Sequence, residues 1–361
     1  MRLLAAILLL ALGASHAEAA KPVEAFKQLR EWFVACDNLR ACMAFGFNDS
    51  ASDFRTFLRI SRAGEPDAQP EIEIFFQFEG VGAHSRLRLT FDDASLGGVP
   101  AEPLPVTVVD DETVKAKLPA ALVPDFLAAV RKAAKLTVED LGTPKANEGD
   151  DGKATVSMSG ATASFLYMDE QQKRVGTVTA LAAKGAKPAS AVPALPALPV
   201  VRVAKPYEGG APLPKAAPKA VVSAAKKLRA ADFDESIEPE PLAARLSASK
   251  TLWGVVTEMP AYNYQYALYV VDNGRVRPVV FDDPTGERDK THEATLPEFD
   301  PKTNILKTFY RGRGMGDCGG ITEWGWDGEK FRMISTTLMT ECRGVRSEQW
   351  PVTYRARVEY R

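Results

Sequence analysis

The sequence predicts an α+β protein that is mainly antiparallel β, with two β-rich domains joined by a linker rich in proline and alanine. Three observations predict this class. Apolar and polar residues alternate with a period of two over several segments, which is typical of strands that bury one face. Turn-forming pairs such as Asn273-Gly274 follow such segments, and prolines gather between residues 184 and 230. Helical periodicity is confined to a few short stretches.

The composition is that of an ordinary globular protein. The chain has 361 residues, of which 45% are hydrophobic and 25% are charged. This length allows two domains, and the composition excludes a wholly disordered, collagen-like or disulfide-dense small protein. Lys and Arg total 45 against 47 Asp and Glu, so the net charge is −2 and no global field attracts nucleic acid. We therefore expect no nucleic-acid partner.

The first 19 residues have the pattern of a secretory signal peptide. An apolar run over residues 3–14 follows Met1-Arg2, and Ala17 and Ala19 have the spacing of a cleavage site after Ala19. The alternative is a membrane anchor, but the run is well short of the roughly 20 apolar residues that cross a bilayer. No later segment is long and apolar enough to span a membrane. We expect a mature periplasmic protein without a transmembrane segment.

The N-terminal domain is predicted over residues 20–183. Alternation predicts strands near residues 32–36, 54–60, 71–79 and 86–91, and residues 155–181 read as a hairpin that turns near 169–173. A stripe of apolar residues at helical spacing predicts a helix over 124–135, and a short helix is expected over 23–29.

The linker is predicted over residues 184–230 and includes a short helix near 220–229. A stretch so rich in proline should run extended over the surface or between domains. Between residues 182 and 229 there are nine Lys or Arg and one acid, Glu208. A solvated linker is the favoured interpretation, and a basic arm for an anionic envelope surface is the alternative. The C-terminal β-rich domain is predicted over residues 231–361.

The chain has four cysteines: Cys36, Cys42, Cys318 and Cys342. An oxidising compartment favours disulfide bonds. If each half folds on its own, the pairs are Cys36–Cys42 and Cys318–Cys342. A thiol nucleophile or a zinc site is the alternative, but there is no C-x-x-C spacing and only His84 and His292 remain after cleavage. We expect no metal ion.

Three stretches carry a resemblance to a known family. They are residues 32–42, which hold the first cysteine pair, residues 176–181 with 187–190, and residues 312–319 with 341–344 behind them. Together they resemble an uncharacterised family of exported bacterial proteins, domain of unknown function 1176. The resemblance implies an envelope location over the whole mature chain and supplies no activity and no catalytic residue.

The glycines of the third stretch match a dinucleotide-binding pattern by spacing alone. Gly314, Gly316 and Gly319 have the G-x-G-x-x-G order, but that motif must turn a strand into a helix, and residues 321–326 are predicted as a strand. A cysteine also lies inside the motif. We interpret the stretch as a tight loop braced by a disulfide, and we expect no cofactor.

The same loop holds the best candidate binding residues: Arg311, Arg313, Asp317, Trp324 and Trp326. Two tryptophans two residues apart lie on one side of a strand. Indole rings beside guanidinium groups are suited to stack on a sugar or a peptide. The alternative places the tryptophans in the core and leaves the arginines solvated. Tyr262, Tyr264 and Tyr266 share one strand face, and we favour a packing role for them over a binding platform.

The sequence favours a non-catalytic binding or interaction module at the cell envelope over an enzyme. Its partner would be an envelope protein or a glycan, and the oligomeric state is left open. One alternative is a hydrolase of envelope polymers, because acids occur at residues 92–93, 110–112 and 282–283. Neighbouring acids on a strand point to opposite faces, so these acids do not form a facing pair by themselves. A secreted enzyme inhibitor that presents residues 312–320 is a second alternative.

Overall fold

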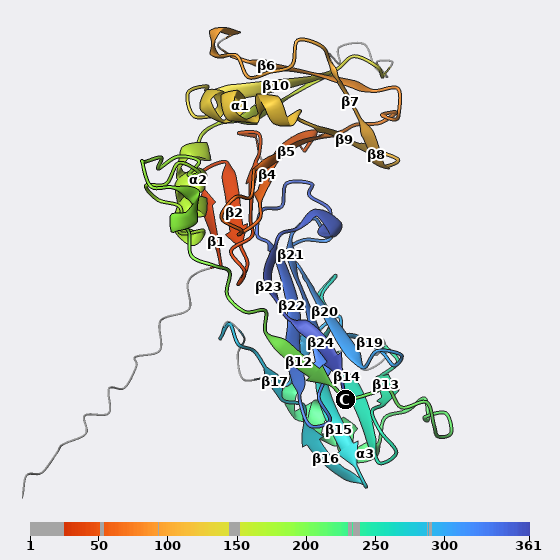
Figure 1. Cartoon of the computed structure of the whole chain (residues 1–361). Helices are drawn as coiled ribbons and strands as arrows, with labels where there is room; N and C mark the ends of the chain where they lie inside the picture. The colour runs from red at the N-terminus through yellow and green to blue at the C-terminus, as the bar shows by residue number, and fades with distance from the viewer. Residues whose placement is uncertain are drawn as a thin grey trace, which may run out of the picture.

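The structure is a computed structural model that describes residues 25–50, 54–92, 94–143, 152–229, 233, 239–286, 288 and 291–361 (Figure 1). The predicted signal peptide lies outside these residues. Strands dominate both halves and helices are few and short, so the predicted mainly antiparallel class is confirmed. We call residues 25–183 the first half, 184–229 the connecting segment and 239–361 the second half. Among the described residues, no helix combines the length and apolarity needed to cross a bilayer.

The first half consists of two antiparallel sheets. Its strands are β1 (Phe26–Leu29), β2 (Trp32–Cys36), β3 (Cys42–Gly46), β4 (Thr56–Arg62), β5 (Glu71–Gln77), β6 (Arg86–Phe91), β7 (Leu104–Pro105), β8 (Thr107–Asp110), β9 (Thr113–Lys117), β10 (Lys135–Asp140) and β11 (Lys153–Ser157). Seven of them form one sheet in the order β1-β2-β3-β4-β5-β9-β8, and four form another in the order β11-β10-β6-β7. One face of the larger sheet packs with the smaller sheet in a single apolar core.

The helices of the first half only partly match expectation. The predicted helix over 124–135 is confirmed in shorter form as α1 (Val123–Val130), with Pro124 in its first turn. The hairpin predicted over 155–181 is wrong, because α2 (Ala161–Gln171) follows β11. The described part of the expected helix over 23–29 is strand β1. Short 3₁₀ turns lie at η1 (Ala94–Leu96) and η2 (Ala120–Leu122), and a third, η3 (Ala189–Ala191), lies in the connecting segment.

The second half also consists mainly of two sheets. Its strands are β13 (Leu242–Arg245), β14 (Lys250–Glu258), β15 (Gln265–Asp272), β16 (Arg275–Pro278), β17 (Phe281–Asp282), β18 (Glu293–Thr295), β19 (Glu298–Asp300), β20 (Ile305–Arg311), β21 (Gly319–Trp326), β22 (Phe331–Met339), β23 (Val352–Arg355) and β24 (Arg357–Tyr360). β13 to β16 form one sheet with β18 beside β15. β17-β22-β21-β20-β19 form the other with β23 beside β22. A 3₁₀ turn, η6 (Ser347–Gln349), precedes β23.

The connecting segment contributes regular structure to the second half. It contains β12 (Val200–Val203), α3 (Lys219–Ala225) and the turn η4 (Lys226–Leu228). β12 pairs in parallel with β24, and α3 packs Val221 and Ala225 against β14 and β15. The proline-rich stretch is therefore fixed to the second half at two places, as the path of the green chain in Figure 1 shows.

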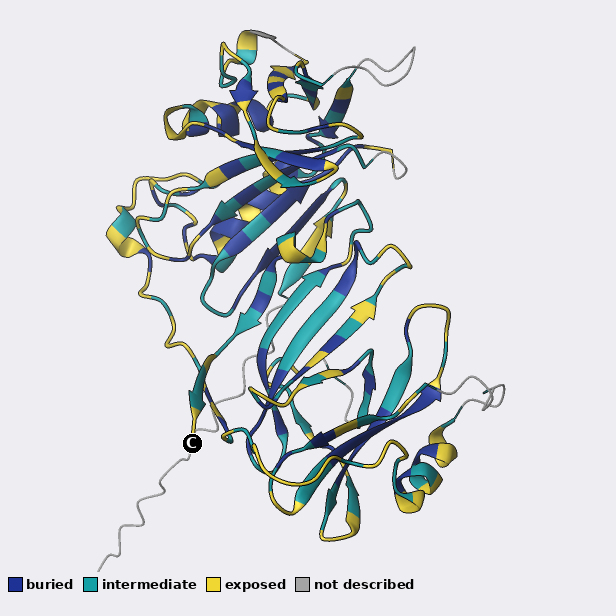
Figure 2. Cartoon of the chain, turned by 90° about the vertical axis from the view of Figure 1, so that its right-hand side faces the viewer, coloured by how far each residue is buried: buried dark blue, intermediate teal, exposed yellow. Residues whose placement is uncertain are grey.

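Several central strands are buried on both faces, which alternation alone does not predict. All five residues of β2 are buried: Trp32 and Val34 face the core of the first half, while Phe33 and Ala35 face the opposite way. In Figure 2 the buried positions gather in the sheets, and the exposed positions gather in turns and on outer helix surfaces. The outer face of the larger sheet is covered because the second half packs against it.

Candidate functional site

An apolar cluster joins the two halves. Phe45, Phe57 and Phe75 of the first half belong to the same buried cluster as Met339 and Trp350 of the second. The Phe57 and Phe75 rings are stacked with centroids 4.4 Å apart. Because these side chains are less than 4% exposed, the contact is continuous core rather than a loose interface between two modules.

The first cysteine loop docks on the last strands of the chain. Asp37 accepts hydrogen bonds from the Leu39 and Ala41 N–H groups, both at 2.8 Å, which fixes the turn between Cys36 and Cys42. The amide of Asn38 pairs with both backbone polar groups of Arg355, at 2.9 and 3.0 Å. Burial raises the pKa of the Asp37 carboxyl, although the Arg355 guanidinium opposes this effect. This loop therefore connects β2 and β3 to β23.

The second cysteine loop docks on the first half. Arg343 donates to the Asn48 and Ser50 carbonyls and forms an ion pair with Glu31 at 2.7 Å. The Gln77 amide donates to the Gly344 carbonyl at 2.9 Å. Both cysteine-containing stretches thus build the junction between the halves, and the structure contains the expected disulfides, Cys36–Cys42 and Cys318–Cys342.

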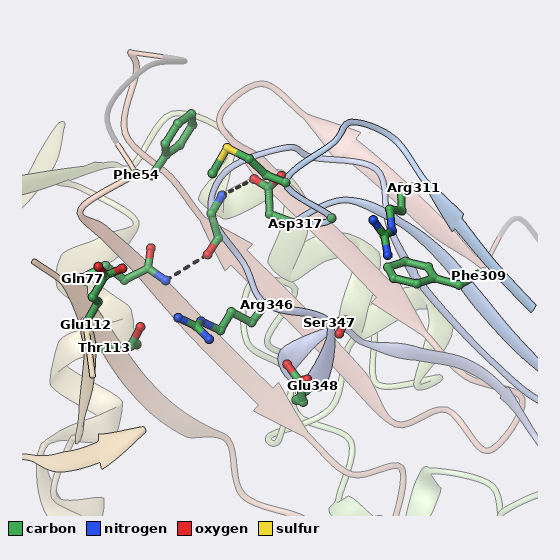
Figure 3. Close-up of a pocket in the computed structure, with 13 residues that line it drawn as sticks. Phe54, Gln77, Glu112, Thr113, Phe309, Arg311, Asp317, Arg346, Ser347 and Glu348 are labelled. Carbon is green, nitrogen blue, oxygen red and sulfur yellow. Dashed lines mark hydrogen bonds between the residues drawn. The ribbon is translucent and has the colours of Figure 1, made fainter. Parts of the chain in front are cut away.

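A pocket of about 570 Å³ opens at this junction (Figure 3). We call it the junction pocket. The first half supplies Phe54, Gln77, Glu112 and Thr113, and the second half supplies Phe309, Arg311, Met315, Gly316, Asp317, Gly344, Arg346, Ser347 and Glu348. The lining combines two arginines with hydrogen-bonding groups and three large apolar side chains, and its volume falls in the range of small-molecule sites.

Arg311 is held in place, and its guanidinium packs beside an aromatic ring of the pocket. Asn263 fixes its backbone through two hydrogen bonds, at 2.7 Å to the carbonyl and 3.0 Å from the N–H. The guanidinium lies 5.2 Å from the centroid of the Phe309 ring, and Figure 3 shows the two side by side. Its Nε is buried without a hydrogen-bond partner within the described ranges. The rest of the guanidinium also has no acceptor among those residues, so a ligand in the pocket can supply one.

Arg313 and Asp317 satisfy one another and leave little capacity for a ligand. Arg313 Nε donates to Asp317 Oδ1 at 2.7 Å, and the Gly344 N–H donates to Oδ2 at 2.7 Å. Burial opposes the charged form of Asp317, but these hydrogen bonds outweigh it and hold the pKa of the carboxyl below its ordinary value. The Arg313 guanidinium also lies 4.7 Å from the centroid of the Phe54 ring. This pair closes one wall of the pocket and orients its loop.

The candidate tryptophans are not surface residues. Trp324 and Trp326 share one face of β21, but each is only 1% exposed, because that face turns into the core of the second half. Trp324 packs edge-on against Phe281 at 4.8 Å, and Trp326 lies 5.1 Å from Phe331. The prediction that these indoles contact a ligand is therefore wrong.

Other sequence candidates have structural roles or lie apart from the pocket. The Asp92 carboxylate accepts a hydrogen bond from the Ala134 N–H group. Asp282 forms ion pairs with Lys330 and Arg332. Asp110 pairs with Arg346 at 3.0 Å. Among the described residues, these three acids therefore have structural partners, while Asp93 lies outside the described residues.

The remaining aromatic candidates are divided between surface and packing positions. Tyr262 is 39% exposed, and Tyr266 packs partly buried against the core of the second half. His84 is exposed, whereas His292 is half-buried beside Tyr269, with Nε2 3.2 Å from the hydroxyl. Burial lowers the pKa of the His292 imidazole. The expectation that His292 is a surface residue is therefore only partly met.

The residues that build this junction lie within a region that a known protein family shares. The sequence model of DUF1176, described as a protein of unknown function, matches residues 26–357. The chain belongs to this family. An uncharacterised protein of Escherichia coli K12, YpfG, is 28% identical over 354 residues, which covers 90% of this chain and 91% of that protein. No solved structure matches the chain.

The family resemblance is thereby confirmed, and the structure locates the stretches that carry it. The first and third stretches form the two docking loops of the junction. The second, residues 176–181, is held from inside by Asp169, whose carboxylate accepts the Leu181, Ala182 and Ala183 N–H groups at 2.8 to 3.0 Å. Two of the three stretches recognisable in the sequence therefore build the junction, and residues 176–181 lie within the first half.

The disulfide of the second docking loop should contribute measurably to stability. Its cysteines are 24 positions apart, against 6 for the other pair. Replacing Cys318 and Cys342 together by serine should lower the free energy of unfolding by about 3 kcal/mol. Replacing Cys36 and Cys42 together by serine should lower it by about 2 kcal/mol. The difference arises because closing the longer loop removes more chain entropy from the unfolded state. Urea unfolding of both variants checks this order. Equal or reversed losses would contradict the loop-entropy argument.

Proposed function

We propose that this protein is exported to the bacterial periplasm and is a non-catalytic binding module of the cell envelope, with the junction pocket as its binding site. The signal-peptide pattern of residues 1–19 supports export. The two disulfides agree with an oxidising compartment. Membership of DUF1176 is compatible with this role and assigns no activity.

The single observation that carries the binding proposal is the state of Arg311. Its backbone is tied to Asn263 and its guanidinium lies beside Phe309 in the pocket lining, yet among the described residues no acceptor pairs with that guanidinium. A guanidinium without an acceptor gains a hydrogen bond when a ligand supplies one. A charged acceptor makes the stronger hydrogen bond. The pocket is therefore suited to an anionic group, and we take this group to be a carboxylate.

The rest of the lining indicates a ligand that is larger than a simple anion. Met315, at 70% exposed, and the half-buried Phe54 offer apolar contact. Glu112 and Glu348 are exposed and accept hydrogen bonds from donors. A peptide or an acidic sugar combines a carboxylate with donors and apolar atoms, so both fit the envelope partners that the sequence favours.

The alternatives receive less support from the same geometry. A hydrolase that works with a pair of carboxyl groups needs one that stays protonated, whereas the pKa of Asp317 is lowered and its oxygens are already hydrogen-bonded. An inhibitor needs a loop that projects freely, whereas residues 312–320 are docked on the first half through Arg313 and Phe54. Binding in the pocket is the function that the geometry supports best.

Titration calorimetry of the mature protein tests the proposal with two probes, an acidic tetrapeptide and a uronic-acid oligosaccharide, each beside its methyl ester. We expect one free acid to bind and its ester to bind more weakly. Arg311→Gln should weaken that binding about ten- to a hundredfold, since a hydrogen bond to a charged group contributes about 1.5–3 kcal/mol. Arg275→Gln, an exposed arginine in the hairpin strand β16, is the matched control. Equal affinity of both variants, or turnover of the bound probe, would contradict the proposal.

A further inference from the structure

A second concave site lies in the first half, away from the junction. It is a groove of about 390 Å³ between helix α1 and residues 178–184, and it shares no lining residue with the junction pocket. Most of its lining is apolar, with Val123, Pro124, Leu127 and Ala128 on the helix side and Val178 and Leu181 opposite. Val178 is 55% exposed, although the preceding residue, Thr177, is buried.

The wall that presents Val178 is fixed in advance of any ligand. The carboxylate of Asp169 accepts three successive N–H groups from residues 181–183, and the Arg174 guanidinium donates to the Thr179 hydroxyl at 2.9 Å. The Val178 N–H donates to the Lys187 carbonyl at 2.9 Å. A wall held by buried hydrogen bonds loses little conformational entropy on binding. The exposed valine is therefore a fixed part of the surface.

The charges that line the groove have one sign. Arg131 and Lys184 are both exposed, and the lining includes no acid among the described residues. Neither cation has a hydrogen bond or ion pair from its side chain within the part of the chain that the structure describes. An apolar groove with cationic residues beside it is complementary to an amphiphile whose head is anionic.

We propose that this groove binds the single acyl chain of a free fatty acid, with the carboxylate at Arg131 and Lys184. The volume lies near the lower end of the range for ligand pockets, so it suits one medium-length chain rather than a two-chain lipid. Burial of methylene groups against Val178 and Leu127 supplies the affinity. The site is independent of the proposed function of the junction pocket.

Thermal-shift and calorimetric titration of the mature protein with lauric acid, below its micelle concentration, test this proposal. Lauric acid should bind, while its neutral glycerol monoester and butyric acid should bind at least tenfold more weakly, because one lacks the charge and the other the chain. Phosphatidylglycerol vesicles should not retain the protein. Vesicle binding without lauric acid binding would mean a membrane surface site and would overturn the proposal.

Variants separate the groove from unspecific binding of the fatty acid. Arg131→Gln with Lys184→Gln should weaken lauric acid binding at least tenfold, and Ala128→Trp, at an exposed helix position, should fill the groove and abolish it. Lys132→Gln with Lys187→Gln changes the same charge on the same two segments outside the groove and should leave binding unchanged. Equal affinity in the two double variants, or unaltered binding by Ala128→Trp, would overturn the proposal.

Discussion

Replacing Asp169 by asparagine is expected to lower the free energy of unfolding by about 3–5 kcal/mol, the cost of removing one partner from a buried ion pair. Asp169 and Arg62 are fully buried or nearly so, and their side chains meet at 3.0 Å. Burial and the nearby Arg174 lower the pKa of the Arg62 guanidinium to about 10, so it stays charged at neutral pH. Without the carboxylate, a buried cation loses its counter-charge.

The loss extends to the backbone that Asp169 holds. Its two carboxylate oxygens accept the Leu181, Ala182 and Ala183 N–H groups in addition to Arg62. An asparagine amide has one oxygen and an NH₂ group, and the NH₂ group cannot accept a hydrogen bond. At least one buried N–H group is therefore left unpaired, which adds to the loss of stability.

Urea unfolding of the Asp169→Asn variant gives the change in free energy directly. Glu170→Gln is the matched control, because it makes the same chemical change at the next helix position, where the side chain is exposed. The control should change stability by less than about 0.5 kcal/mol. If Asp169→Asn lowers the free energy of unfolding by less than about 1 kcal/mol, the buried ion pair does not hold residues 181–183 in place.

The sequence predicts much of the secondary structure because local pattern determines it. The strand over residues 86–91 and the turn at Asn273-Gly274 are each determined by residues adjacent in the sequence. Both occur where expected. The hairpin predicted over 155–181 fails for a physical reason. Buried polar residues of α2, such as Ser164 and Asp169, interrupt its apolar face in a count of periodicity, and the ionic partner of Asp169, Arg62, lies far away in the sequence.

The candidate site was predictable only in part for the same reason. Arg311 and Asp317 occur in a charged, glycine-rich loop, so the sequence identifies them as candidates. Phe54, which precedes β4, and Gln77, at the end of β5, complete the pocket from the first half and give no local signal that they do so. Trp324 and Trp326 show the limit most clearly, because alternation gives their shared face but not whether that face is buried.

Truncation of Phe57 to alanine should destabilise the junction by about 3–5 kcal/mol, the usual cost of removing a buried phenylalanine. Phe57 is 1% exposed and belongs to the cluster that also contains Trp350 from the second half. Because this buried cluster is shared by both halves, the loss should appear in a single unfolding transition. Calorimetry and urea unfolding of Phe57→Ala measure both properties.

A double-mutant cycle distinguishes a shared core from two separate ones. Phe57→Ala and Trp350→Ala should show a coupling energy above about 0.5 kcal/mol, because each leaves part of the same cavity. Phe126→Ala removes an equally buried ring from the inner face of α1. Its effect on the free energy of unfolding should add to that of Trp350→Ala, because the two residues belong to different clusters. Additivity in both cycles, with two resolved transitions, would mean that the halves are stable independently and that the junction pocket opens between modules able to separate.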